Sequence, residues 1–227
     1  MFDVNIWMIE LTDKLKNTFS GRLQLVGLQG SYRRGEAHAQ SDIDAVVILD
    51  TLSLEDLTLY KQILSSMPES DKACGFISGK QELLNWPKHE LFQFVYDTTA
   101  FWGEMSGLFP EIEQEDIITS VKISASGLYH LCCHTFIHDY DNINLLKSFF
   151  KSAFFLLQAL YYLCNDVYIH TKKELLPLIK EDEHKILEIS MNWENYEQAI
   201  LANPDPYYNL IFKWCANIIN TTALHQL

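Results

Sequence analysis

Residues 23 to 50 read LQLVGLQGSYRRGEAHAQSDIDAVVILD, and the fold prediction starts from these residues. Two short apolar runs, residues 23–28 and 45–49, flank a polar segment. Short apolar runs bounded by turn residues are typical of buried strands. The sequence therefore predicts two buried strands, joined by a polar connection that carries the candidate chemistry.

Two aspartates open the second apolar run. Asp42 and Asp44 are separated by Ile43. Because side chains alternate along a strand, both carboxylates should point to one face while Ile43 points into the core. Two carboxylates at that spacing repel each other, and a shared proton or a bound cation relieves the repulsion. Oxygen ligands favour a hard metal, so we expect Mg²⁺ or Mn²⁺ to be held together with substrate phosphates.

The Gly30-Ser31 pair ends the first run. A glycine lets the backbone approach a ligand closely, and a short helix within residues 32–40 would turn its free N–H groups and the Ser31 hydroxyl towards an anion. A phosphate cradle beside a metal-binding acid pair is typical of phosphoryl-transfer enzymes. The competing interpretation is that Asp42 and Asp44 merely cap a strand and that Gly30-Ser31 is an ordinary turn.

These residues resemble the signature of a known family. Gly30-Ser31, Arg34-Gly35 and Ser41-Asp42-Ile43-Asp44 are similar to the motif of the DNA polymerase beta-type nucleotidyltransferase superfamily. The resemblance implies transfer of a nucleoside monophosphate, by default AMP from ATP, to an acceptor hydroxyl, with pyrophosphate leaving. It implies metal ligands at Asp42 and Asp44, and nucleotide contacts from Gly30, Ser31, Arg34 and Ser41. For Arg33 and Arg34, solvated loop arginines are the alternative.

The superfamily also implies a third carboxylate, which completes the metal site or deprotonates the acceptor hydroxyl. Residues 89–96, HELFQFVY, form an aromatic-rich apolar run that we interpret as a fourth strand. Glu90 is the first candidate for catalysis and for the metal, because an acid leading such a strand resembles the proposed general base of aminoglycoside adenylyltransferases. Asp97 is the second candidate, and a regular strand would place the two acids on opposite faces. A solvated strand end is the alternative for Glu90.

The character of the chain changes near residue 110. Glycine nearly vanishes, Gly127 being the last one, and helical periodicity continues to the end. We predict a nucleotidyltransferase catalytic domain at residues 1–112 and a helical substrate-binding domain at residues 113–227, forming the second wall of a cleft. This order is similar to that of small antibiotic nucleotidyltransferases, which modify aminoglycosides or lincosamides. It implies an α+β fold in which a nucleotidyltransferase-type mixed β-sheet, flanked by helices, precedes an all-α helical bundle.

Further elements are predicted from periodicity and capping residues. In the first domain they are a helix at 3–19, a helix capped by Ser53 and closed by Pro68, a third strand at 73–78 and helical turns at 79–86. In the second domain they are helices at 111–138, 145–164, 172–179, 183–191, 192–202 and 207–220.

Two lysines and a histidine stripe in the helical half each allow two interpretations. Lys151 interrupts an apolar helix and Lys172 opens the next, so either could reach the triphosphate, or it could simply extend its stem to solvent. His130, His134 and His138 fall on one helix stripe at four-residue spacing. That spacing suits a metal, but no second Cys/His pair closes a tetrahedral site, so a packed or acceptor-facing stripe is favoured.

Composition restricts the function classes. The net charge of −13 argues against a sequence-independent grip on nucleic acid and suits a cationic acceptor. The five cysteines form no CxxC pair, so we expect reduced thiols and a cytoplasmic protein. No membrane association is expected, because the nearest apolar run, residues 149–163, is interrupted by polar residues. Both a monomer and a homodimer are compatible with the sequence.

Three rival functions remain open on the sequence. A template-dependent polymerase of the same superfamily shares the Gly-Ser motif, but it would need the basic surface that this acidic chain lacks. A protein-modifying or toxin-antitoxin nucleotidyltransferase would use the helical half to dock a protein partner. An inactive nucleotide-binding module would keep affinity for ATP without turnover.

Overall fold

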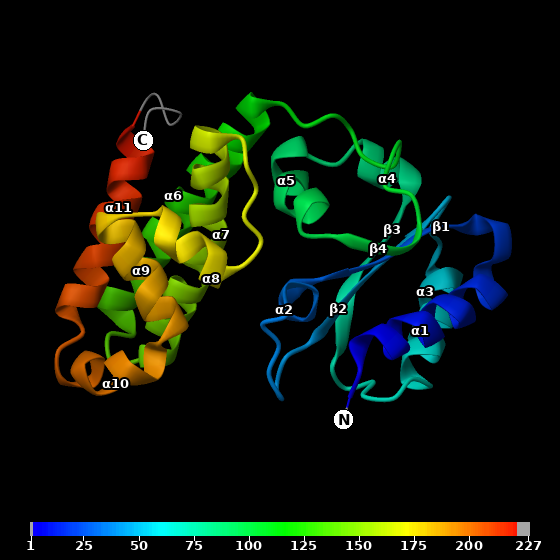
Figure 1. Cartoon of the computed structure of the whole chain (residues 1–227), viewed down its shortest axis with the longest axis horizontal. Helices are drawn as coiled ribbons and strands as arrows, with labels where there is room; N and C mark the ends of the chain where they lie inside the picture. The colour runs from blue at the N-terminus through cyan, green and yellow to red at the C-terminus, as the bar shows by residue number, and fades with distance from the viewer. Residues whose placement is uncertain (1, 222–227) are drawn as a thin grey trace. The chain divides into compact units, whose positions relative to one another are not determined.

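The computed structural model describes residues 2–221 (Figure 1). The chain divides into two compact units, Met1–Ile112 and Glu113–Leu227. We call them the N-terminal unit and the helical unit, and describe each by itself.

A four-stranded mixed sheet forms the centre of the N-terminal unit, as predicted. Its order is β3-β2-β1-β4. Strand β1 runs antiparallel to β2 and to β4, whereas β2 and β3 are parallel. The strands are β1 Leu23–Gln29, β2 Ile43–Leu49, β3 Ala73–Gly79 and β4 Thr99–Gly103. Three of the four strands expected from the sequence, at residues 23–28, 45–49 and 73–78, are therefore confirmed, and β4 was not foreseen.

Two helices of this unit begin at side-chain caps. The Asp3 carboxylate accepts from the backbone of Asn5, and Ser53 and Asp56 form a reciprocal capping box. The helical segments are α1 Val4–Phe19, η1 Ser20–Arg22, α2 Gly30–Arg34, α3 Leu54–Ser65, α4 Lys80–Leu84 and α5 Lys88–Tyr96. The helices predicted near residues 3–19, 53–68 and 79–86 are confirmed.

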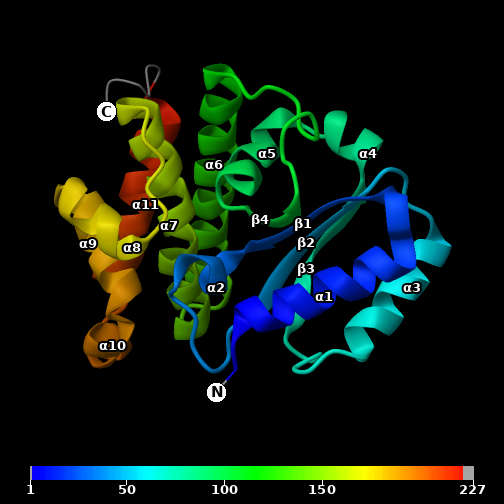
Figure 2. The same cartoon turned by 45° about the vertical axis from the view of Figure 1, so that its right-hand side comes forward.

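Both faces of the sheet are covered (Figure 2). Helices α1 and α3 pack on one face, where Ala45 and Val47 of β2 join a core with Leu11 of α1. Helices α4 and α5 cover the other face, where Val46 and Ile48 meet Leu83 and Leu91. Because successive strand residues alternate between these faces, Asp44 lies on the α4/α5 face with Val46 and Ile48.

The interpretation of residues 89–96 as a strand was wrong. They belong to helix α5, whose buried residues are Leu91 and Phe92. Apolar residues of α5 recur at three- or four-residue spacing, so they share one helix face. Phe94 packs edge-on against Phe76, with the ring centroids 4.8 Å apart. A short apolar run cannot be assigned from pattern alone, and packing onto the sheet selects the helix here.

The helical unit contains the predicted succession of helices. Its helical segments are α6 Gln114–His138, α7 Ile143–Asn165, α8 Lys172–Leu175, η2 Leu176–Leu178, α9 Glu181–Met191, α10 Trp193–Ala202 and α11 Asp205–Asn220. Helix α6 packs on α7 and α11, and α7 also packs on α9. Pro206 lies in the first turn of α11 rather than before it, where its missing N–H costs nothing.

Helix α7 is the core helix of this unit. Phe150, Leu157 and Gln158 are among its buried residues, and the Gln158 side-chain amide donates to the Ile169 carbonyl oxygen at 2.7 Å. By length and composition alone α7 could also cross a membrane, although the sequence led us to expect no such segment. In the most apolar window of α7, 56% of the residues are buried. Packing within the helical unit therefore explains why this helix is so apolar.

An ion-pair cluster ties the start of β1 to α3. The Arg22 guanidinium donates to both carboxylate oxygens of Asp56, each at 2.8 Å, and its Nε lies 3.2 Å from Asp50. Asp56 is buried, and the hydrogen bonds from Arg22 hold the pKa of its carboxyl well below the usual value of 3.8, although burial opposes this shift.

This cluster should make the stability of the N-terminal unit depend on acid pH. A carboxyl whose pKa is lowered by folding stabilises the fold above its unfolded pKa, and this contribution disappears as the pH falls through 3.8 towards the lower folded pKa. We expect Arg22→Met to lower the melting temperature near neutral pH and to flatten its decline in acid. Lys14→Met, which removes an exposed pair with Glu10, is the control. Parallel acid profiles of wild type and Arg22→Met would contradict this account.

Candidate functional site

Gly30 and Asp44 meet where β1 ends and α2 begins. Asp44 pairs in register with Gln29, the residue before Gly30. Gly30 has a φ of +71°, and a Cβ atom added to it would overlap the Asp44 carboxylate. Position 30 therefore requires glycine for two reasons: the backbone conformation, and the space that the Asp44 carboxylate occupies.

Asp42 and Asp44 have different surroundings. Asp42 lies directly before β2 and is exposed, whereas Asp44 is the second residue of the strand and is half-buried. Ile43 between them is fully buried, as the alternation predicts. The donor set is oxygen only. It suits Mg²⁺, which binds through one or two carboxylates and takes its other ligands from water and phosphate.

The connection between β1 and β2 is held by its own polar groups. Helix α2 ends at Gly35, which has a φ of +70° and donates to the carbonyl oxygen of Ser31. The Ser41 hydroxyl is buried and accepts from the His38 backbone N–H at 2.9 Å. The helix expected within residues 32–40 thus starts earlier, at Gly30, and Ser41 closes a turn. Phosphate binding by Ser31 and Ser41 stays a prediction.

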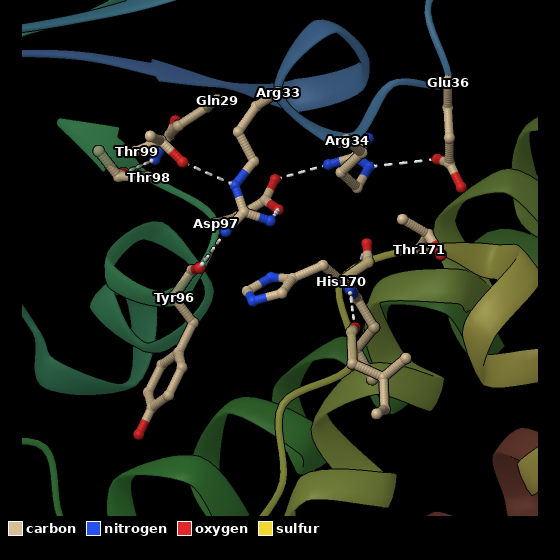
Figure 3. Close-up of polar contacts among 12 residues, drawn as sticks. Gln29, Arg33, Arg34, Glu36, Tyr96, Asp97, Thr98, Thr99, His170 and Thr171 are labelled. Atoms are coloured by element: carbon tan, nitrogen blue, oxygen red, sulfur yellow. Dashed lines mark hydrogen bonds and ion pairs between the residues drawn. The ribbon is translucent and has the colours of Figure 1, made fainter. Parts of the chain in front are cut away.

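Asp97 lies next to this motif, although it follows α5 rather than ending a strand (Figure 3). Its carboxylate is buried and pairs with Arg34 at 2.5 Å and with Arg33 at 3.6 Å. The Gly30 backbone N–H is close enough to lower its pKa. Burial is nevertheless the largest effect and raises the pKa of Asp97, against the neighbouring charges of Arg34 and Arg33.

The two arginines are anchored within the N-terminal unit (Figure 3). The Arg33 Nε donates to the Thr99 hydroxyl at 3.1 Å, and the Arg34 Nε lies 3.2 Å from a Glu36 carboxylate oxygen. Their side chains are only 14% and 9% exposed, so the interpretation as solvated loop arginines was wrong. Charged groups are buried in this way only when they are paired, and Asp97 is the shared partner. The nucleotide contact predicted for Arg34 stays a prediction.

Glu90 has a different environment from the one expected. It lies in the first turn of α5, its side chain is 56% exposed, and a carboxylate oxygen accepts from the Trp86 indole N–H at 2.8 Å. It therefore does not lead a strand. Among residues 2–221, no group of three or more His, Cys, Asp or Glu side chains is arranged to hold a metal. A three-carboxylate site of Asp42, Asp44 and Glu90 is not assembled.

The two lysines lie in the helical unit. Lys151 is exposed on α7. The Lys172 ammonium donates to the Ser190 hydroxyl at 3.0 Å and lies 5.6 Å from the centre of the Phe154 ring. Their contact with a triphosphate stays a prediction. The histidine stripe on α6 is exposed, and the His134 and His138 rings lie 4.6 Å apart, so the packed alternative for it was wrong.

Sequence reasoning missed the residues that hold Asp97 in place. The Gln29 amide donates to the Thr98 hydroxyl at 2.7 Å and to the Phe94 carbonyl oxygen at 2.9 Å, which fixes the end of α5 against the end of β1. The available signal was the polar Asp97-Thr98-Thr99 sequence after an aromatic run, which marks a boundary between two elements.

Known proteins resemble this chain in part of its sequence and in its fold. Residues 9–91 match the family model described as a nucleotidyltransferase domain. The crystal structure of spectinomycin adenyltransferase AAD(9) from Enterococcus faecialis with ATP and spectinomycin matches with a TM-score of 0.60 and 12% identity, over 95% of this chain and 99% of that chain.

A crystal structure of a toxin-antitoxin with AMP-PNP matches with a TM-score of 0.33 and 24% identity, over 60% of this chain and 98% of that chain. No curated protein sequence matches the chain. The residues that match the family model include strands β1 and β2, the Gly30-Ser31 turn, Asp42 and Asp44. Residues 9–91 are thus similar to a nucleotidyltransferase domain, as the signature residues predicted, and the chain shares the fold of the spectinomycin adenyltransferase.

Proposed function

We propose that this protein transfers a nucleoside monophosphate from a nucleoside triphosphate to a hydroxyl group of a small cationic acceptor. The observation that carries the proposal is the arrangement around Gly30. Its Cα lies against the Asp44 carboxylate, and its N–H faces Asp97. Two acids from separate parts of the chain therefore approach the Gly30 turn, and the exposed Asp42 precedes Asp44 by two residues.

Asp42 and Asp44 would hold the metal. Bound there, Mg²⁺ would neutralise charge on the phosphates and on the leaving pyrophosphate. The residues themselves have simpler tasks. The short turn at Gly30 leaves space for the Asp44 carboxylate, and Ser31, in the first turn of α2, would meet the phosphate oxygens.

Asp97 is the better candidate for the third carboxylate. It lies beside Gly30, whereas Glu90 is exposed and bound to Trp86. In the proposed reaction, the acceptor oxygen forms a bond to the α-phosphorus while the bond from this phosphorus to the bridging oxygen breaks. Pyrophosphate leaves, and the hydroxyl proton passes to Asp97. Its raised pKa makes it a better proton acceptor than an exposed aspartate.

Two observations bear on the nature of the donor and of the acceptor. ATP is the first donor to test, because the spectinomycin adenyltransferase was crystallised with ATP. A cationic acceptor is supported by the net charge of −13, which attracts cations and repels nucleic acid. An aminocyclitol or aminoglycoside of the kind bound by that adenyltransferase is the acceptor class that we propose. A cytoplasmic location follows from this proposal, because nucleoside triphosphates are found there.

The metal ligands can be tested by pyrophosphate release with each nucleoside triphosphate and Mg²⁺ across a panel of aminoglycosides, aminocyclitols and lincosamides. We expect Asp42→Asn and Asp44→Asn to lower kcat by roughly a hundredfold or more, because each removes a carboxylate ligand of the Mg²⁺ ion that would neutralise the leaving pyrophosphate. EDTA should have the same effect on wild type, reversed by added Mg²⁺. Asp13→Asn, on the exposed side of α1, is the matched control. Full activity in the Asp42 and Asp44 variants would refute the assignment.

The third carboxylate is decided by comparing Asp97→Asn with Glu90→Gln. We expect Asp97→Asn to lower kcat roughly a hundredfold and to remove the acid limb of the pH profile, because a general base contributes on this scale. Glu90→Gln should leave kcat and the pH profile nearly unchanged. Thermal melting of both variants separates a loss of catalysis from a loss of the buried ion pair with Arg34. The reverse order of effects would return the role to Glu90.

Gly30→Ala and Gly35→Ala form a matched pair. Both residues have a φ near +70°, so alanine costs about 1 to 3 kcal/mol of backbone strain at either position. Only at Gly30 would the added Cβ displace the Asp44 carboxylate, whereas at Gly35 nothing lies within 4 Å. We expect Gly30→Ala to abolish transfer and Gly35→Ala to lower stability alone. Equal activity losses in the two variants would show that strain, rather than the position of Asp44, controls the reaction.

A further inference from the structure

Helices α6 and α11 of the helical unit leave a hollow between them. Its volume is about 500 Å³. We call it the α6–α11 hollow. Its walls include Phe136 and Ile137 from α6, and Tyr208 and Phe212 from α11, with Asp205 at the start of α11. The volume falls within the range of about 300 to 1,000 Å³ that is typical of small-molecule sites.

Aromatic rings gather on one side of this hollow. The Phe136 ring lies edge-on to the rings of Tyr140 and Tyr208, with centroids 5.2 and 5.3 Å apart, and the Tyr140 and Tyr208 rings are stacked at 5.8 Å. Phe136 is 45% exposed and Phe212 is 38% exposed. Large rings therefore remain open to solvent at a concave surface, which is unusual for a satisfied core.

The charge around these rings is negative. The Tyr140 hydroxyl donates to the Asp205 carboxylate at 2.6 Å, and this hydrogen bond is the largest cause of the raised pKa of Tyr140. The pKa of Tyr208 rises to about 12, chiefly through burial, with Asp139 and Asp141 adding to the shift. Among the described residues that line the hollow, none is a lysine or an arginine.

We propose that the α6–α11 hollow binds an organic cation, an ammonium group carried on an apolar body. The faces of aromatic rings attract cations, and an apolar body would cover Ile137 and Phe212 while the ammonium lies near Asp205 and the aromatic rings. An organic anion would meet Asp205 and the nearby aspartates. An uncharged apolar ligand would fill the hollow without using the carboxylate. The site lies within the helical unit, so it does not depend on the proposed transfer reaction.

Three ligands that share a benzene ring but differ in charge test this proposal on the full chain. Benzyltrimethylammonium, benzyl alcohol and benzenesulfonate are titrated by calorimetry, with the cation expected to bind most tightly and to weaken in added salt. Cys133 lines the hollow, and Cys164 lies exposed outside it. Alkylation by iodoacetamide, mapped by mass spectrometry, should therefore slow at Cys133 and stay unchanged at Cys164 when the cation is present.

Three variants locate the binding groups. Asp205→Asn should weaken binding of the cation about two- to fivefold, as expected for an exposed charge pair. Phe136→Leu should reduce the preference for the cation over benzyl alcohol, by roughly two- to thirtyfold, through loss of a ring face. Glu194→Gln makes the same charge change at an exposed position outside the hollow and should leave the affinity unchanged. Melting curves confirm that each variant is folded.

Four results would overturn the proposal. Equal affinity for the cation and for benzyl alcohol would show that the hollow selects only for apolarity. Absence of binding at millimolar concentration would exclude the site. Unchanged alkylation of Cys133 with measurable binding would place the cation elsewhere. Concentration-dependent dimerisation in sedimentation, abolished by Ile137→Asp, without affinity for the cation, would show that a second copy covers the hollow.

Discussion

The close approach of Gly30 to the Asp44 carboxylate is the constraint on which the candidate site depends. It follows from strand register, because Gln29 pairs with Asp44 and the chain must then turn away at once. A left-handed glycine makes that turn without a side chain. The arrangement brings backbone N–H groups and a carboxylate into one small region. In the proposed reaction, such a region would attract phosphate only with a cation that offsets the carboxylate, so the motif and the proposed metal would act together.

Burial of opposite charges holds the rest of the site together. Arg34 and Asp97 have side chains only 9% and 10% exposed, and each would be costly to bury alone. Their pairing joins α2 to the end of α5, and the Gln29 amide reinforces the same junction through Thr98. The Arg34–Asp97 ion pair therefore contributes more to the position of the Asp97 carboxylate than to the stability of the fold. It keeps a carboxylate near Gly30 while allowing burial to raise the pKa of Asp97.

The sequence predicts those features that depend on neighbours along the chain. The helix cap at Ser53 and the alternation across Ile43 are local, and both are present. Residues 89–96 were misassigned because the spacing of their aromatic residues fits a buried strand as well as a helix. The contact of Phe94 with Phe76, which lies on strand β3, favours the helix.

The place of Asp97 could not be predicted either, since it depends on Arg34, far away in the chain. The five-residue strand β4 was missed for a similar reason. Its pairing with β1 is the evidence for it, and no pattern within so short a segment reveals a distant partner.

The pairing of β4 with β1 has a consequence for the order of folding. This edge of the sheet can close only when Gly103 is available to pair with Leu25, whereas α6 and α7 of the helical unit pack together and are joined by a short turn. Closing so long a loop is entropically costly, so distant strand pairing is slow compared with helix pairing. During synthesis, β1 and β2 can associate as soon as both emerge, but Asp97 arrives much later. The candidate site is then among the last parts of the N-terminal unit to form, and a chain interrupted before residue 97 would present the signature aspartates without the buried acid near Gly30.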